Sequence, residues 1–98
     1  MIERIVKMTF HQSEVEPFIA LFYKSRPKIL NFRGCIHVEL WQDVNDSCVL
    51  STYSRWESEE DLNAYRASAT FSGIWKETKK KFSKPPEAIS FKKVDKQY

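Results

Sequence analysis

Residues 35–65, CIHVELWQDVNDSCVLSTYSRWESEEDLNAY, decide the fold of this chain. Residues 35–42 alternate in side-chain character, as do residues 48–56, and the polar turn DVND separates the two runs. This pattern predicts a β-hairpin. Ser58-x-x-Asp61 follows at once and is typical of a helix start in which a serine caps the first turn. The segment therefore predicts two paired strands that run directly into a helix.

The residues before this hairpin predict a strand and a helix. Alternation over residues 2–10 is typical of a strand, with bulky side chains on both of its faces. Ser13-x-x-Glu16 is a second capping signature, and apolar residues at helical spacing follow it. We expect this helix to run to about Ser25, because Pro27 disfavours its continuation.

The residues after the hairpin complete a βαββαβ order. The helix that starts at Ser58 is expected to restart at 68–70 and to continue toward Thr78. Lys84-Pro85-Pro86 should end the helical region, and residues 88–94 should form a short last strand. This order predicts an α+β, ferredoxin-like fold with an antiparallel sheet, as a single domain over residues 1–98.

Composition limits the class of protein. The chain has 98 residues, of which 42% are hydrophobic and 14% aromatic, so we expect one compact domain. No apolar run approaches the length of a membrane span, which predicts a cytoplasmic protein without a membrane partner. A turn centred on residues 45–46 would place Cys35 and Cys48 several residues apart along the hairpin. The cysteines should therefore be free thiols, and we expect no bound metal.

Bulky side chains on both faces of the strands predict a partner surface. Helices on one side of a sheet leave the other side bare, yet Trp41 and Leu40 lie on opposite faces, as do Leu50 and Tyr53. A bare face of this kind usually marks an interface. The simplest closed arrangement is a homodimer that packs sheet against sheet.

The hairpin and the helix after it resemble a known family. FRGCIHVELWQD, then STYSRWESEEDLNAY, with SATF after it, is similar to the antibiotic biosynthesis monooxygenase domain of the dimeric α/β-barrel superfamily. Gly34-Cys35 matches the family's strand entry, and Trp56-Glu57-Ser58 matches its strand-to-helix junction. The resemblance covers roughly residues 2–94. It implies a dimeric α/β barrel with a pocket between sheet and helices.

The same resemblance implies two kinds of activity. Some members oxidise phenolic polyketides or quinols to quinones without a cofactor, and others degrade haem. Quinol-oxidising members often carry histidines where this chain has Tyr65 and Thr70. Haem-degrading members use an asparagine on the first strand, where this chain has Val6-Lys7, and a ligating histidine at the place of Trp75. The missing haem ligand disfavours haem degradation, so we expect no cofactor.

The residues themselves offer an aromatic pocket. Four rings are predicted to form the walls that bind substrate: Phe22, Tyr65, Phe71 and Trp75. The Tyr65 hydroxyl is a candidate catalytic group, and His37 is a better candidate for the base than the loop residue His11. We therefore predict a cofactor-independent monooxygenase that acts with O2 on a small aromatic or polycyclic phenol or quinol.

Other interpretations stay open at this stage. Rings at helical spacing are also typical of a core, so the chain could be a non-catalytic, dimeric module that binds a small aromatic ligand. Lys7 and Arg55 could stabilise a phenolate or could be ordinary surface charges. An RNA-recognition module shares the βαββαβ order, but CVLSTYSRW lacks its glycine-rich aromatic signature. We therefore expect no nucleic-acid partner.

Overall fold

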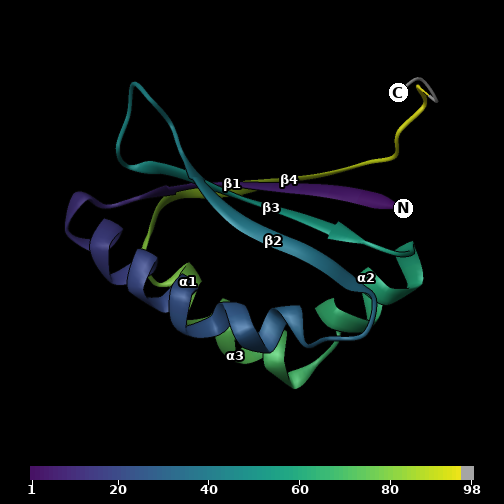
Figure 1. The fold of residues 1–98 in the computed structure, drawn as a ribbon. Coiled ribbons are helices and arrows are strands. Elements are labelled where there is room, and N and C mark those ends of the chain that lie inside the picture. Colours follow the sequence, from purple (N-terminus) through teal and green to yellow (C-terminus); the bar gives the residue numbers. More distant parts are fainter. Residues whose placement is uncertain (96–98) are drawn as a thin grey trace.

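The structure is a computed structural model that describes residues 1–95. The last three residues of the domain predicted over 1–98 lie outside the described part. A four-stranded antiparallel sheet in the order β2-β3-β1-β4 carries its helices on one face (Figure 1). The main elements are β1 (Ile2–Phe10), α1 (Val15–Leu30), β2 (Cys35–Gln42), β3 (Val49–Trp56), α2 (Glu59–Arg66), α3 (Ala69–Lys79) and β4 (Phe82–Phe91), with a short helix η1 (Gln12–Glu14). The predicted ferredoxin-like α+β fold is confirmed.

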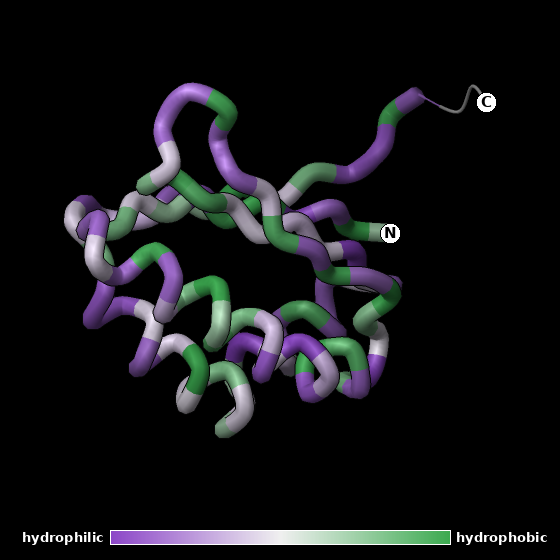
Figure 2. The backbone as a smooth tube through the Cα atoms, turned by 60° about the vertical axis from the view of Figure 1, so that its left-hand side comes forward, coloured by the Kyte–Doolittle hydropathy of each residue, from purple (hydrophilic) through white to green (hydrophobic). Residues whose placement is uncertain are grey.

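The core lies between the sheet and the helix layer. Figure 2 shows the two layers with hydrophobic and hydrophilic residues interleaved along both. On the sheet side Phe10, Leu50 and Trp56 are each only 1% exposed. Phe18 of α1 stacks on Phe10, with ring centroids 4.4 Å apart. Because successive strand residues point to opposite faces, this inward set leaves the intervening residues on the side of the sheet away from the helices.

Helix α1 differs from the sequence prediction at both ends. It continues to Leu30, so the expected end at Ser25 is wrong, and Pro27 lies inside it. An interior proline costs about 3 kcal/mol. Here Pro27 is exposed near the end of the helix, and continuation buries Ile29. The Ser13 cap is also wrong, because η1 precedes the helix and its N-cap residue makes no side-chain capping bond.

Strand β4 starts earlier than predicted. It begins at Phe82, six residues before the expected start at residue 88, and includes both prolines. It is an edge strand that pairs only with β1, so the missing N–H groups of Pro85 and Pro86 disrupt one ladder at most. The register with β1 shifts between Lys7 and Thr9, opposite the prolines. Burial of Phe82 against Phe10, at 5.4 Å between centroids, accounts for the early start.

The pairing of β2 with β3 fixes the position of the hairpin turn and keeps the two cysteines apart. Asp43 N donates to Val49 O at 2.9 Å and Gln42 faces Leu50, so the turn is centred on residue 46 and not between residues 45 and 46 as expected. Cys35 and Cys48 are free thiols, as predicted.

No helix within residues 1–95 has the length and apolar character needed to cross a bilayer. The cytoplasmic location stays a prediction.

Gly34, the residue before β2, packs closely against the first turn of α2. Gly34 has a φ of +84°, and a Cβ there would lie 2.3 Å from the side chain of Asp61. The Ser58 hydroxyl accepts from Asp61 N at 3.1 Å and donates to the Asp61 carboxylate at 3.0 Å, so the predicted cap is confirmed. Glu57 N also donates to Gly34 O at 2.8 Å. Only glycine combines this backbone conformation with this close approach.

We predict that Gly34→Ala lowers the free energy of unfolding by roughly 2–4 kcal/mol, because it adds left-handed strain and a clash with Asp61. Gly73→Ala is the matched control. A Cβ at Gly73 meets nothing within 4 Å, so alanine there should stabilise α3 by about 0.5–1 kcal/mol. Urea unfolding at equal protein concentrations measures both effects. A loss of stability of equal size in the two variants would contradict the role of Gly34.

Candidate functional site

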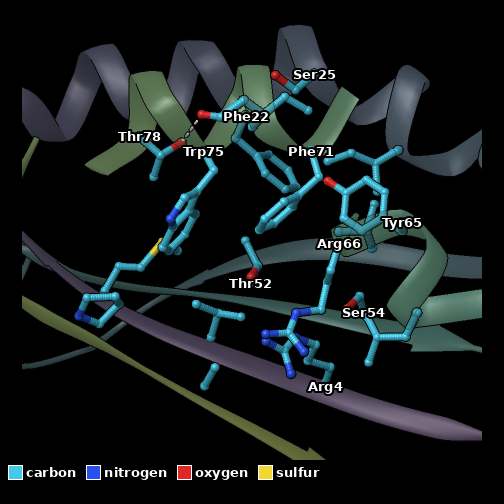
Figure 3. A pocket seen from close by; sticks show the side chains of 18 of the residues that line it. Arg4, Phe22, Ser25, Thr52, Ser54, Tyr65, Arg66, Phe71, Trp75 and Thr78 are labelled. Carbon is cyan, nitrogen blue, oxygen red and sulfur yellow. Dashed lines mark hydrogen bonds between the residues drawn. The ribbon is translucent and has the colours of Figure 1, made fainter. Parts of the chain in front are cut away.

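A cavity of about 310 Å³ lies between the inner face of the sheet and the three helices. Figure 3 shows β1 and β3 on one side of it and α1, α2 and α3 on the other. Its wall is mainly apolar, with side chains such as Val6, Met8, Leu21 and Ile74. Ligand pockets usually have volumes of roughly 300–1,000 Å³ and walls of this character. The cavity therefore has room for a small ligand.

All four aromatic residues predicted as substrate walls line this one cavity: Phe22, Tyr65, Phe71 and Trp75. Phe71 stacks on Trp75 at 5.7 Å between centroids and meets Tyr65 edge to face at 5.3 Å. Trp56 stacks on the far side of Tyr65 at 5.0 Å. The structure thus brings the predicted rings together. Their binding of a substrate stays a prediction.

Local capping places Tyr65 and Phe71 against each other. The Ser68 hydroxyl donates to Tyr65 O at 2.6 Å and accepts from Phe71 N at 3.1 Å. It thus closes the end of α2 and caps the start of α3. The interruption at Ser68 redirects the chain, so that rings from two short helices face the same cavity. The predicted restart of the helix at 68–70 is confirmed.

The Tyr65 hydroxyl is suited to donate a hydrogen bond. Tyr65 is 8% exposed, and burial raises its pKa to about 12, with a smaller contribution from Cys35. Within residues 1–95 its hydroxyl has no hydrogen-bond partner, and Figure 3 shows the residue at the wall of the cavity. A phenol with this pKa stays protonated at neutral pH. It can therefore donate to an oxygen of a ligand, but it cannot act as a base.

His37 does not reach the cavity. It is an outward residue of β2, whereas its neighbour Val38 takes the inward place and lines the cavity. The His37 ring bonds to the carboxylate of Glu39, which also accepts from the indole of Trp41. The predicted catalytic pair of His37 and Tyr65 is thus separated by the sheet within one chain. Successive side chains of a strand point to opposite faces of the sheet, and the choice of His37 as base did not determine which face it occupies.

Lys7 and Arg55 also belong to the outward face. Lys7 is exposed, and Arg55 pairs with Glu3 at 3.3 Å between Nε and Oε1. The same carboxylate accepts from the Tyr53 hydroxyl. Neither cation lines the cavity, so within one chain neither can stabilise a phenolate there.

The polar part of the cavity wall was not among the residues predicted from the sequence. Two arginines, Arg4 of β1 and Arg66 of α2, line it, together with the hydroxyl residues Ser25, Thr52, Ser54 and Thr78. The Ser54 hydroxyl accepts from the Trp56 indole at 3.0 Å, and Thr78 donates to Ile74 O at 2.8 Å. A signal for Arg4 was present in the sequence. It alternates in phase with Val6 and Met8 and is therefore a charge on an otherwise apolar face.

The cavity wall in the described part of the chain contains no histidine, cysteine or carboxylate. It therefore does not fit a haem held by a histidine, as in globins and peroxidases, or by a cysteine, as in P450 enzymes. No group of three or more His, Cys, Asp or Glu within residues 1–95 could hold a metal ion. What the wall does offer is aromatic surface, hydroxyl donors and two cations.

Comparisons with known proteins give a family and several similar structures. The family model described as antibiotic biosynthesis monooxygenase matches residues 1–76. A conserved protein from Methanosarcina mazei Go1 is 22% identical, with a TM-score of 0.89 over 94% of this chain and 91% of that chain. SnoaB from Streptomyces nogalater, described as a cofactor-independent oxygenase, is 12% identical, with a TM-score of 0.85 over 96% and 93% of the two chains. At these identities the structures show a shared fold. A search of curated proteins finds no match.

We predict that the stability of the protein depends on Tyr65 at alkaline pH. The folded-state pKa of about 12 exceeds the ordinary value of 10.0, so ionisation of Tyr65 leaves the free energy of unfolding unchanged below pH 10. The free energy of unfolding then falls as the pH rises from 10 toward 12, because Tyr65 ionises first in the unfolded state. Tyr65→Phe should reduce this loss, and the exposed control Tyr23→Phe should retain it. Urea midpoints at pH 9, 10 and 11 test this, and identical slopes in all three proteins would contradict it.

Proposed function

Because the chain belongs to the antibiotic biosynthesis monooxygenase family, we propose that it oxidises a small aromatic or polycyclic phenol or quinol with O2 and without a cofactor. The observation that carries the proposal is the cavity of about 310 Å³ whose wall combines Phe22, Phe71 and Trp75 with the protonated hydroxyl of Tyr65. Flat aromatic surface suits a planar substrate. A donor inside an apolar wall suits the oxygen anion that the reaction needs.

The reaction requires little from the protein. A phenol loses its proton, and the electron-rich ring carbon opposite the oxygen then forms a bond to one atom of O2. That atom becomes the second carbonyl of a quinone. The other oxygen atom leaves as water with the two hydrogens that the hydroxyl and the ring carbon have lost. In a quinol, whose opposite carbon already carries a hydroxyl, the oxygen atom adds at an unsubstituted ring carbon, and the products are a hydroxyquinone and water. Atoms and electrons balance in both cases with O2 as the only oxidant.

The residues have separate roles in this scheme. The stacked rings of Phe71 and Trp75 hold the substrate plane and exclude water from it. The Tyr65 hydroxyl and the Trp75 indole N–H are the neutral donors that orient the substrate oxygen. Within residues 1–95 no carboxylate or imidazole lines the cavity, so the substrate proton passes to water, or the substrate enters already ionised.

The same lack of a base favours a second candidate function. A dimeric module that binds a small aromatic ligand without reaction would need the rings and donors of this cavity but no group to accept a proton. The separation of His37 from the cavity by the sheet is the observation that favours it.

We also propose that the protein is a homodimer that packs the outward faces of two sheets together. Trp41, Ile89 and Phe91 are 43%, 52% and 49% exposed. Trp41 also stacks on Tyr53 at 5.1 Å, which makes a flat aromatic surface across β2 and β3 on that face. Apolar surface of this kind is typical of an interface.

Oxygen uptake tests the activity. We expect the chelator-treated protein to consume O2 with some members of a panel of quinols and anthrols. The Tyr65→Phe, Trp75→Ala double variant should lose at least about tenfold in rate, since it removes both neutral donors. The exposed control Tyr23→Phe should keep the full rate. Equal uptake by the double variant and the native protein would place the reaction elsewhere, and ligand binding without uptake would favour the binding module.

Sedimentation equilibrium tests the dimer. We expect a dimer at micromolar concentration, and a shift to monomer in Trp41→Glu, because a carboxylate would be buried in the proposed interface. Tyr23→Glu is the matched control, since Tyr23 is a 60% exposed aromatic residue of α1, in the helix layer. A native protein that sediments as a monomer at this concentration would refute the proposal.

A further inference from the structure

Two arginines lie beside each other at the cavity wall. Arg4 extends from the inward face of β1, and Arg66 follows Tyr65 on α2. Figure 3 shows their side chains converging from the sheet and the helix layer, below Phe71 and Tyr65. Arg4 is half-buried, whereas Arg66 is exposed, so the cavity meets solvent in this region. The two cations thus stand where a ligand in the cavity would meet water.

Neither arginine has an acidic partner within residues 1–95. Within the described residues, the Arg4 side chain makes one hydrogen bond, from Nη1 to the neutral Ser90 hydroxyl at 3.0 Å. Glu3, next to Arg4 in the chain, bonds to Tyr53 and Arg55 on the outward face, and Asp61 of α2 bonds to Ser58. Burial and the charge of Arg66 both lower the pKa of Arg4. The described part of the chain therefore leaves this charge pair uncompensated.

We propose that Arg4 and Arg66 bind a carboxylate carried by the aromatic ligand, and so make the cavity specific for aromatic carboxylates. This inference rests on the proposed function, because it names the substrate class of the same cavity. A guanidinium offers donors in a planar fork that matches a carboxylate, and two forks from opposite walls can share its two oxygens. A ligand anion would also remove the repulsion between the two cations.

The arrangement of the wall sets the orientation of such a ligand. The stacked pair of Phe71 and Trp75 offers a flat apolar surface, and the arginines are charged groups beneath it (Figure 3). A ligand with its rings along the aromatic wall and its carboxylate at the arginines satisfies both. A neutral ring system satisfies only the first, and it leaves both guanidinium groups without an anionic partner.

Equilibrium binding followed by quenching of tryptophan fluorescence tests the proposal. The probes are 3-hydroxy-2-naphthoate, its neutral amide 3-hydroxy-2-naphthamide, and 2-naphthol, all at pH 7.5. We expect the native protein to bind the carboxylate about tenfold or more tightly than the amide, as charge-assisted bonds require. Arg4→Gln and Arg66→Gln should each lose most of this preference and bind the amide as before.

Lys76→Gln is the matched control, because it removes one positive charge from an exposed site of α3 outside the cavity wall. It should keep the full preference. If Arg4→Gln fails to fold, the binding preference of Arg66→Gln decides the test, because Arg66 is an exposed helical residue. Equal binding of carboxylate and amide by the native protein would overturn this inference alone. No binding of any of the three probes would overturn it together with the proposed aromatic site.

Discussion

The close approach of Gly34 to Asp61 is the constraint on which the rest of the site depends. The positive φ of Gly34 lets the start of β2 pass directly over the first turn of α2, and Ser58 fixes that turn through Asp61. Tyr65 lies one helical turn farther on, where it stacks on Trp56 at 5.0 Å. The candidate donor of the cavity is therefore held by a backbone junction and a buried indole, and not by a hydrogen bond of its own.

The chemistry of the cavity follows from what its wall lacks as well as from what it holds. No carboxylate or imidazole of residues 1–95 lines it, but two guanidinium groups and the raised-pKa hydroxyl of Tyr65 do. Such a wall cannot remove a proton by general base catalysis. It can lower the pKa of an entering acid, because cations and donors favour the charged form of a ligand. In the proposed oxidation, the wall therefore stabilises a substrate anion whose proton has passed to water.

Much of this could be predicted from the sequence, because local patterns determined it. The hairpin, the Ser58 cap and the aromatic wall follow from alternation and helical spacing in residues 35–75. The errors concern residues whose effect depends on tertiary context. Pro27 did not end α1, since continuation buries Ile29, and the prolines near residue 85 fit because β4 is an edge strand. His37, the predicted base, lies on the face of the sheet away from the cavity, while Arg4, in phase with Val6, was not recognised as part of the wall.

The two faces of the sheet divide the charged residues between them. On the outward face Glu3 and Arg55 neutralise each other, which suits the burial of that face in the proposed dimer. Inward charges are of one sign and lack a partner in the described chain, which suits a face that receives a ligand from solvent. A protein that used this cavity only as a core would gain stability by replacing Arg4 with an apolar residue, since half-burial of an uncompensated cation is unfavourable. The presence of arginine at that position is better explained by a ligand that supplies the missing negative charge.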